Sequence, residues 1–452
     1  MAGEAHIHVA LHRKAYLSMN TPQQAYVLLE IMPTVAIATP QAVNFSLVLD
    51  RSGSMGGEKL QQMKEAARLV VERLSPADLL SVVVFDDSAE VVVPCGSLQD
   101  PATIQGKIDA IQERGGTHMS TGMDSGLKEL LRGQSPDRVS RMLLLTDGQT
   151  WEDQEACLAL ADQCRQAGIS INALGLGVGE DSNWDPRLLE ELAVRSGGEW
   201  VAVDRPDKVS AVFASTLRSL QGTLATNVSM TMRMVEGVSP RAVWRVTPLI
   251  SRLGHQAVGS RDIQVFLGDL QHSSGQSILA DLLLPPRKPG SYRLLQADIL
   301  YDVPESGLTR QQAVVDVVVT FTEDAALASQ TQPRLMNIIE RVVAHKLQTQ
   351  ALDEAAAGDI PRATQRLRAA ATRLLELGEV DMAEEASQQA QRLEQVGQVD
   401  PAAMQRMRYA TKRLTEAEIQ DSETQPGQSE STPAPPEGES SQQDTGEQAE
   451  SA

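Results

Sequence analysis

Five residues in three separate segments carry side-chain oxygens that could together bind a divalent cation. They are Asp50, Ser52, Ser54, Thr117 and Asp147. Hard cations prefer oxygen ligands, and Mg²⁺ in particular takes few carboxylates and keeps water or substrate in its remaining positions. Two carboxylates and three neutral hydroxyls match that preference. The residue types therefore predict a binding site for Mg²⁺ or a similar ion.

The two carboxylates each follow an apolar run that is typical of a buried strand. Asn44–Leu49 precedes Asp50, and Val139–Thr146 precedes Asp147. Continuous apolar runs are expected for parallel strands that are covered on both faces, and open α/β sheets hold their sites at the carboxyl ends of such strands. We therefore expect both carboxylates at one edge of one sheet.

Strands and helices alternate from residue 43 to residue 221, which predicts a doubly wound, mostly parallel sheet with helices on both faces. A hairpin turn at Asp86-Asp87 indicates one antiparallel edge strand, although these two carboxylates could also form a second cation site. The expected strands are Asn44–Leu49, Leu79–Phe85, Glu90–Val93, Val139–Thr146, Ile169–Leu174 and Glu199–Val203, and the expected helices are Glu58–Leu74, Pro101–Gln112, Thr121–Leu131, Glu152–Ala167, Pro186–Ser196 and Pro206–Leu220.

The same five residues resemble the metal-ion-dependent adhesion site of von Willebrand factor A domains. That site has Asp-x-Ser-x-Ser, a Thr after Gly-Gly and then Thr-Asp-Gly, and all three motifs occur here in this order. The resemblance implies that Ser52, Ser54 and Thr117 supply hydroxyl oxygens, while Asp50 and Asp147 coordinate directly or through water. It also implies that the ion is Mg²⁺, or else Ca²⁺ or Mn²⁺, and that a Glu or Asp of a protein partner completes the coordination.

The loops around the predicted ion should form the partner-binding rim, which consists of Met55, His118, Gln149, Thr150 and Trp151. Met55 and Trp151 are candidate apolar anchors, because aromatic residues are enriched in interface hot spots. Ordinary helix packing is the alternative for Trp151. His118 is expected on the rim and not as a ligand, because ligation at this loop in similar domains comes from the neighbouring Thr.

The segments on either side of the α/β unit alternate in the manner of antiparallel strands. An isolated N-terminal pair would be marginal in water, so we expect the α/β domain (43–221) to be inserted into one β-sandwich built from residues 1–42 and 222–325. The expected strands are Ile7–Leu17, Gln24–Ile31, Asn227–Met234, Ala242–Val246, Asp262–Leu267, Ser277–Leu284, Ser291–Tyr301 and Gln312–Phe321.

Residues 332–415 have helical patterning, with Asp359-Ile360-Pro361 as a cap followed by Pro in the first turn of a helix. They predict a small helical bundle, with a degenerate helical repeat as the alternative. Residues 416–452 contain ten acidic residues and no Lys or Arg. This composition is typical of a disordered acidic tail that aids solubility or serves as a docking peptide.

The net charge of −20 disfavours a nucleic-acid partner, because a phosphate backbone attracts basic surfaces. Three cysteines are too few for a disulfide framework and favour a reducing compartment. Neither a signal-peptide layout nor a membrane-spanning apolar stretch is found in the sequence, so we expect no membrane insertion and a cytoplasmic location.

These observations predict a metal-dependent protein–protein interaction module and not an enzyme. The resemblance implies an intracellular bacterial complex or signalling assembly, with an AAA+ ATPase or a kinase or phosphatase signalling protein as possible partner. A metal-dependent hydrolase of phosphatase type and a surface adhesin are the alternatives. Against the hydrolase, Ser52 occupies the place of a second carboxylate, and neither motif contains a Lys that could clamp a phosphate.

Overall fold

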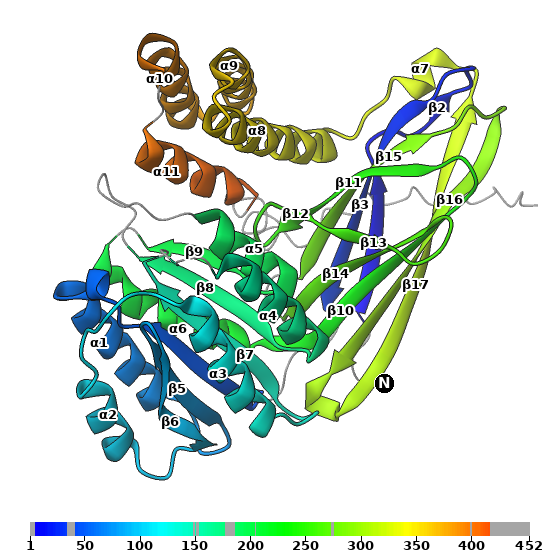
Figure 1. Cartoon of the computed structure of the whole chain (residues 1–452). Coiled ribbons are helices and arrows are strands. Elements are labelled where there is room, and N and C mark those ends of the chain that lie inside the picture. The colour runs from blue at the N-terminus through cyan, green and yellow to red at the C-terminus, as the bar shows by residue number, and fades with distance from the viewer. Residues whose placement is uncertain are drawn as a thin grey trace, which may run out of the picture.

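The computed structural model describes residues 5–33, 41–147, 150, 153–176, 186–203, 205–272, 275–397 and 400–415. It consists of an α/β unit, a β-sandwich and a group of helices that lies above both (Figure 1). The two ends of the α/β unit lead into strands of the same sandwich, so the unit is inserted between two of its strands.

The α/β unit contains one six-stranded sheet in the order β6-β5-β4-β7-β8-β9, in which only β6 is antiparallel to its neighbour. This confirms the predicted parallel sheet and its antiparallel edge strand. The strands are β4 (Val43–Asp50), β5 (Leu79–Phe85), β6 (Ala89–Ser97), β7 (Val139–Thr146), β8 (Ser170–Leu176) and β9 (Trp200–Val203).

Helices cover both faces of this sheet because successive strand residues point to opposite sides. In β4, Phe45, Leu47 and Leu49 enter one core, and Val48 enters the other. The first core is closed by α1 (Glu58–Arg73), α2 (Pro101–Asp109) and α6 (Val209–Gln221), and the second by α3 (Met119–Arg132), α4 (Gln154–Gln166) and α5 (Pro186–Ser196). The expected final helix is divided, because residues Pro206–Lys208 form a 3-10 turn before α6.

The sandwich has two sheets whose inner faces share one core. One sheet has the order β1-β3-β15-β11-β12, and the other has the order β13-β14-β10-β16-β17-β2. The strands are β1 (Ala5–Leu11), β2 (Tyr16–Leu17), β3 (Gln23–Pro33), β10 (Thr223–Met234), β11 (Ser239–Thr247), β12 (Ser251–Leu253), β13 (His255–Ala257), β14 (Asp262–Gln271), β15 (Gln276–Leu284), β16 (Gly290–Val303) and β17 (Leu308–Thr322).

The N-terminal segment corrects one prediction, because Ile7–Leu17 is two strands in different sheets. β1 pairs with β3 in one sheet, whereas Tyr16 and Leu17 of β2 pair in parallel with the end of β17 in the other. Between them the backbone N–H of His12 donates to the carbonyl of Tyr26, and Arg13 forms an isolated bridge with Thr331. The turn at His12 therefore carries the chain across the open end of the sandwich.

The α/β unit and the sandwich approach each other most closely at two glycines. Gly197 follows α5 with φ +80°, and Gly268 lies in β14 with φ +79°. A Cβ on Gly268 would lie 2.1 Å from the carbonyl oxygen of Gly197, so no side chain could be accommodated there. Beside them, the buried guanidinium of Arg141 in β7 forms an ion pair with Asp269 of β14. These contacts hold the amino edge of the parallel sheet against the sandwich.

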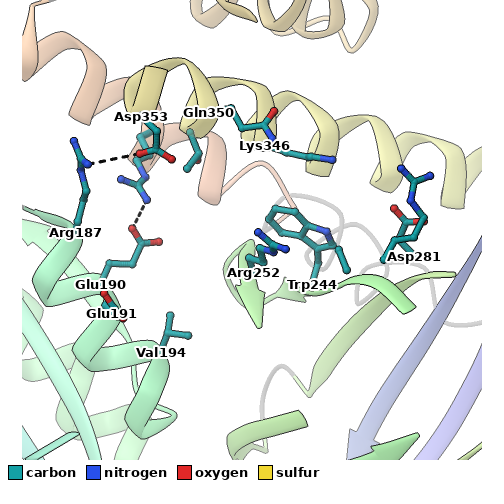
Figure 2. Close-up of a pocket in the computed structure, with 14 residues that line it drawn as sticks. Arg187, Glu190, Glu191, Val194, Trp244, Arg252, Asp281, Lys346, Gln350 and Asp353 are labelled. Atoms are coloured by element: carbon teal, nitrogen blue, oxygen red, sulfur yellow. Dashed lines mark ion pairs between the residues drawn. The ribbon is translucent and has the colours of Figure 1, made fainter. Parts of the chain in front are cut away.

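The helical group packs on the outer face of the sandwich sheet that contains β11 and β15. Leu28, Trp244 and Leu279 from that face share one core with the helices. The helices of this group are α8 (Pro333–Ala356), α9 (Ile360–Glu376), α10 (Val380–Val396) and α11 (Pro401–Lys412), whereas the short α7 (Ala325–Ala328) lies against β17 and β2. The helical group, the sandwich and α5 of the α/β unit meet around a pocket (Figure 2). Residues 416–452 lie outside the described residues.

Candidate metal centre

Asp50 and Asp147 lie at the same edge of the parallel sheet. Asp50 is the last residue of β4, and Asp147 directly follows β7, which pairs with β4 in register Leu49 to Leu145. Both side chains are buried, with 0% of Asp50 and 7% of Asp147 exposed. The strand ends thus bring two carboxylates together at the edge where α/β sheets bind ligands.

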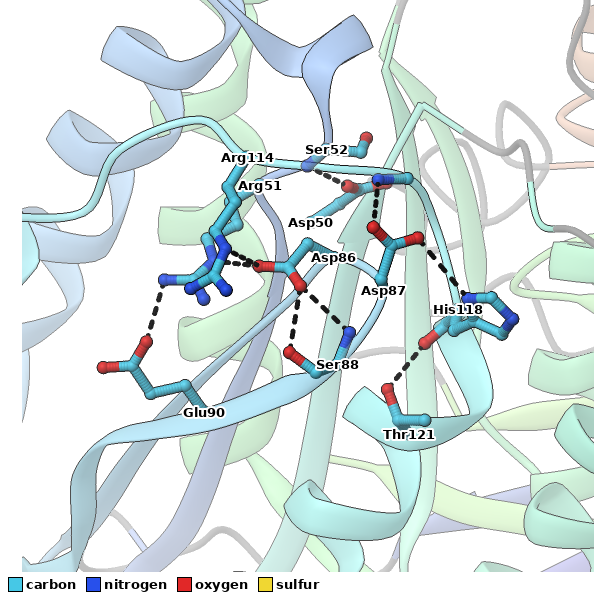
Figure 3. A network of polar contacts seen from close by, with 11 residues as sticks. Asp50, Arg51, Ser52, Asp86, Asp87, Ser88, Glu90, Arg114, His118 and Thr121 are labelled. Atoms are coloured by element: carbon cyan, nitrogen blue, oxygen red, sulfur yellow. Dashed lines mark hydrogen bonds and ion pairs between the residues drawn. The ribbon is translucent and has the colours of Figure 1, made fainter.

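Both oxygens of Asp50 accept hydrogen bonds from neighbouring residues. The backbone N–H of Ser52 donates to Oδ1 at 2.8 Å, which is visible in Figure 3, and the hydroxyl of Thr146 donates to Oδ2 at 2.7 Å. Burial nevertheless raises the pKa of Asp50 to about 6, and the nearby negative charge of Asp147 adds to the effect of burial, while the bonds from Ser52 and Thr146 oppose it. A positive charge placed beside this carboxylate would stabilise its ionised form.

The Asp-x-Ser-x-Ser loop and the Gly-Gly-Thr loop are bound to each other through their backbones. The N–H of Gly53 donates to the carbonyl of Gly115 at 3.1 Å, and the N–H of Arg114 donates to the carbonyl of Arg51 at 2.8 Å. The hydroxyls of Ser52 and Ser54 lie 3.1 Å apart. Thr117 follows Gly115 by two positions and is only 4% exposed. The loops therefore hold the three predicted hydroxyl ligands near the end of β4.

Asp86 and Asp87 hold these loops in place (Figure 3). Asp86 accepts from the Ser88 backbone at 2.9 Å, and its other oxygen accepts from buried Arg51 at 2.8 Å. Burial opposes ionisation of Asp86, but the bonds from Ser88 and Arg51 outweigh it and lower its pKa. Asp87 accepts from the N–H of Gly116 at 3.0 Å. The hairpin turn is confirmed, and each of the two carboxylates accepts a hydrogen bond from the protein.

Asp147 has one oxygen bound to a cation of the protein and one without a partner. The ammonium of Lys59 lies 3.0 Å from Oδ2, and the same ammonium donates to the carbonyl of Ser54 at 3.2 Å. Oδ1 is buried and has no hydrogen-bond partner among the described residues. Buried carboxylate oxygens are normally satisfied, so an orphan oxygen indicates a missing ligand such as an ion. The donor set, two carboxylates and three hydroxyls, has the chemistry that a hard cation requires.

The predicted rim is only partly formed as expected. Met55 is fully buried in the core beneath α1, which corrects the expectation that it anchors a partner, because the 3-10 turn Gly53–Met55 points it inward. The side chain of His118 is 46% exposed. Thr150 is half-buried, and its hydroxyl accepts a long bond from the N–H of Met119 at 3.4 Å. Gln149 and Trp151 lie outside the described residues.

Three residues near the site were not singled out from the sequence. Lys59 contacts Asp147, Thr146 contacts Asp50, and Asp153 accepts a bond from the N–H of Ser120 at 2.7 Å while also binding Thr150. Thr146 lies inside the Thr-Asp-Gly motif and could have been proposed from it. Lys59 also removes one argument against a hydrolase, because a lysine does lie beside a site carboxylate.

Other classes of site find little support in the part of the chain that the structure describes. Among those residues no group of three or more His, Cys, Asp and Glu side chains is arranged to hold a metal, which leaves a mixed carboxylate and hydroxyl site as the candidate. Cys95, Cys157 and Cys164 are free thiols. None of the described helices is both long enough and apolar enough to cross a lipid bilayer.

Comparisons with known proteins agree with this architecture. Residues 44–214 match the von Willebrand factor type A domain, and residues 333–417 match the Sll0103-like C-terminal alpha-helical domain. The uncharacterized protein sll0103 of Synechocystis is 31% identical over 271 residues, which cover 59% of this chain and 63% of that protein. Calcium-activated chloride channel regulator 1 of Bos taurus is 28% identical over 40% of this chain and 18% of its own length.

A solved structure extends the similarity beyond the α/β unit. The von Willebrand factor type A protein from Catenulispora acidiphila superposes with a TM-score of 0.72, covering 91% of this chain and 97% of its own at 18% identity. At that identity the likeness concerns the fold alone. The chain therefore contains a von Willebrand factor A domain within an arrangement of parts that also occurs in another protein.

Proposed function

We propose that the von Willebrand factor A domain of this chain binds Mg²⁺ through Asp50, Ser52, Ser54, Thr117 and Asp147 and presents it to an acidic side chain of a protein partner. The orphan Oδ1 of Asp147 is the observation that carries this proposal. The contacts of Lys59 support it further. One ammonium reaches both the Asp147 carboxylate and the Ser54 loop, so a single cation can bridge the two sides of the site.

The composition of the site explains why a partner would supply a carboxylate. Asp50 and Asp147 balance the charge of a divalent ion, but the hydroxyls of Ser52, Ser54 and Thr117 are weak donors. Mg²⁺ demands near-octahedral coordination by oxygen. An ion held in this way attracts one more anionic oxygen, and the exposed Ser54 lies on the side from which such a ligand could approach.

Calorimetric titration with Mg²⁺ tests the metal site directly. Wild-type protein should bind one ion, and Asp147→Asn should lose at least about 100-fold in affinity, because replacing even residues that only support metal ligands costs 10- to 100-fold. Asp124→Asn is the matched control, since Asp124 is an exposed carboxylate of the same domain whose oxygen binds Lys128. Equal Mg²⁺ affinity in wild type and Asp147→Asn would refute the assignment.

Affinity capture tests the partner. Wild-type protein in Mg²⁺ should retain a client that is lost both in chelator and with Asp50→Ala. We propose that this client belongs to an intracellular bacterial complex or signalling assembly, with an AAA+ ATPase or a kinase or phosphatase signalling protein as the first candidates. A client retained equally in Mg²⁺, in chelator and by Asp50→Ala would show that binding does not pass through the ion.

The contact between Lys59 and Asp147 favours a second candidate function, that of a metal-dependent phosphatase. A lysine beside a metal carboxylate could contact a phosphate oxygen, although Ser52 stands where such an enzyme would need another carboxylate. We propose that the site binds without turnover. Hydrolysis of a generic phosphomonoester that depends on Mg²⁺ and disappears with both Asp50→Ala and Lys59→Met would establish the enzyme instead.

A further inference from the structure

A pocket that contains none of the predicted metal ligands lies where the three parts of the molecule meet. It has a volume of about 520 Å³, which is within the range of ligand sites, and domain interfaces are preferred places for such sites. Its walls come from α5, from the outer face of β11, β12 and β15, and from α8 and α11. Figure 2 shows Lys346 extending from α8 towards Trp244 and Arg252 of the sandwich.

The cations of this pocket outnumber the carboxylates available to them. Arg187 is paired with Asp353 at 3.7 Å, and Arg408 is paired with Glu190 at 2.5 Å. Three further basic side chains line the pocket and are exposed, with no carboxylate at ion-pair distance in the described part of the chain: Arg241, Arg252 and Lys346. In a protein of net charge −20, this is a local concentration of unbalanced positive charge.

The remaining carboxylates of the pocket do not cancel that charge. Glu191 is already bound to Arg195 of its own helix at 2.6 Å. Asp281 is 8% exposed and accepts a hydrogen bond from Gln24 at 2.9 Å. Burial raises the pKa of Asp281, while the bond from Gln24 and the charges of Arg241 and Lys346 oppose that rise, so this one carboxylate faces two of the three cations. An anionic ligand would therefore meet an excess of cations.

Some buried polar atoms beside the pocket have no hydrogen-bond partner in the described part of the chain. The hydroxyl of Thr349 and the side-chain carbonyl of Gln350, both on α8, are buried and have no hydrogen-bond partner in the described structure, and the same is true of Nε of Arg408. These atoms are enclosed by protein and out of reach of solvent, so they are part of the polar wall and not contact points for a ligand. Trp244 provides an apolar wall beside them. Since it combines this apolar wall with the three cations, the lining suits an acidic peptide better than an isolated ion.

The chain carries such a peptide next to the pocket. The hydroxyl of Thr415 donates to the carbonyl of Val246 at 2.6 Å, so the described part of the chain ends beside β11. Trp244 is two positions away on the same strand, a distance of about 7 Å at 3.3 Å per residue. Residues 416–452 contribute ten carboxylates and no Lys or Arg.

From this charge complementarity and position, we propose that the pocket binds the acidic segment 416–452 of its own chain. Carboxylates of the segment would pair with Arg241, Arg252 and Lys346. Since the pocket is built by the A domain, the sandwich and the helical group together, the bound segment would fasten these three parts to one another. The inference is independent of the proposed metal site, with which the pocket shares no residue.

Binding of the segment in trans tests the proposal. A truncated chain ending at Thr415 should bind a synthetic peptide of residues 416–452 in fluorescence anisotropy, and the affinity should fall as salt rises. The double variant Arg241→Glu/Arg252→Glu should lose at least tenfold in affinity. Arg261→Glu/Lys288→Glu is the matched control, because these residues are also exposed on the sandwich, change the charge equally and lie outside the pocket. The control should bind like the unaltered truncated chain.

Zero-length carbodiimide crosslinking tests the same contact in the full chain. Lys346 should form amide links with Glu or Asp of 416–452 in preference to Lys288, and mixing of isotopically light and heavy protein should show that the links lie within one chain. Equal peptide affinity of the two double variants would overturn the proposal. Links found only between light and heavy chains would overturn it as well, by assigning the segment to a second copy.

Discussion

The A domain carries a buried cluster of charge at each of two places, and the two clusters are balanced differently. At the junction with the helical group, Glu190 of α5 contacts both Arg408 and Lys412 of α11. At the carboxyl edge of the sheet, Asp50 and Asp147 are both buried, only Asp147 is paired with the partly exposed Lys59, and the other oxygen of Asp147 has no partner among the described residues.

The pKa values of Glu190 and Asp50 shift in opposite directions, in agreement with this difference in charge balance. Burial opposes ionisation of Glu190, but the charges of Lys412 and Arg408 outweigh it, so its pKa is lowered. Burial of Asp50 is not compensated, and its pKa is raised to about 6. Removing charge from water is costly unless the charge is paired. The charge of Glu190 is therefore balanced within the chain and joins α5 to α11, whereas the raised pKa of Asp50 agrees with our proposal that the sheet edge binds an external cation.

Neutralising the junction carboxylate should have the largest effect on stability. Glu190→Gln leaves Arg408 and Lys412 buried without a counter-charge, and breaking a buried pair in this way typically costs about 3–5 kcal/mol. We expect a large drop in the unfolding temperature of α5 and the helical group. Lys412 also lies over the ring of Trp200 at 4.8 Å, and that contact would be lost if the ammonium moved towards water.

Glu191→Gln is the control for this change. Glu191 is the next residue of α5, and its ion pair with Arg195 is half exposed, so its loss should cost less than about 1 kcal/mol. Thermal unfolding of the two variants side by side separates a buried pair from a surface pair. Similar unfolding temperatures of Glu190→Gln and Glu191→Gln would contradict the interpretation that the buried ion pairs of Glu190 stabilise the junction between α5 and α11.

Replacing a carboxylate by an amide at the sheet edge should not lower the unfolding temperature of the metal-free protein, in contrast to Glu190→Gln. Asp147→Asn removes a carboxylate from a pair that repel each other, so the metal-free unfolding temperature should stay level or rise slightly. Mg²⁺ at 100 times its Kd should stabilise wild type by about 2.7 kcal/mol and should not stabilise the variant. Thermal unfolding with and without Mg²⁺ measures both effects, and a metal-free variant that melts far below wild type would make Asp147 a structural residue.

Much of the α/β unit was predictable because each parallel strand is a continuous apolar run with a fixed end. β7 begins and ends at Val139 and Thr146 as expected, and so the position of Asp147 followed from the run before it. The segment 7–17 was misassigned because its alternation continues through the turn at His12, where the chain passes to the other sheet. Alternation shows which residues face inward but not which sheet they enter.

The positions of site residues at the end of a strand could be predicted from the sequence. The positions of residues that depend on how a helix or turn packs could not. Asp50 and Asp147 follow from local sequence. Met55 was placed on the rim because it neighbours Ser54, yet one 3-10 turn points it into the core. Lys59 reaches Asp147 only because of the orientation of α1 against the sheet, and sequence periodicity does not specify how far a long side chain extends.

The junction should also make stability depend on pH. Burial, together with the charges of Lys412 and Arg408 and against that of Glu190, lowers the pKa of His345 to about 3. Because the pKa in the unfolded chain is near 6.5, the unfolded state takes up a proton first, so stability is complete above pH 6.5 and is lost as the pH falls towards 3. The loss between pH 7 and pH 5 is about 2 kcal/mol.

His345→Gln tests this dependence, because it retains a polar group beside Thr411, whose hydroxyl lies 3.1 Å from the histidine ring. The difference in unfolding free energy between pH 7 and pH 5 should shrink in the variant. Buried His12, whose pKa is lowered to about 4, should contribute the slope that remains. Exposed His255 provides the control, since His255→Gln should leave the pH dependence as in wild type. An unchanged slope in His345→Gln would place the pH-sensitive group elsewhere.

The smallest expected effect concerns Lys59, the cation paired with Asp147. If Lys59 occupies a place that Mg²⁺ must take, then Lys59→Met should strengthen Mg²⁺ binding, whereas loss of a cation at the junction weakens the protein. The contact of Lys59 with Asp147 is partly exposed, so its removal should be worth up to about 1 kcal/mol, or roughly a fivefold gain in affinity.

Lys64→Met is the control, because it removes the same charge from the same helix. The ammonium of Lys64 donates to the carbonyl of Asp109, away from the site. Calorimetric titration of both variants therefore distinguishes local competition from a general change of charge. A gain confined to Lys59→Met would identify the lysine as a competitor of the ion, equal gains would reduce the effect to net charge, and a weaker affinity would make Lys59 a support of the loops that hold the ligands.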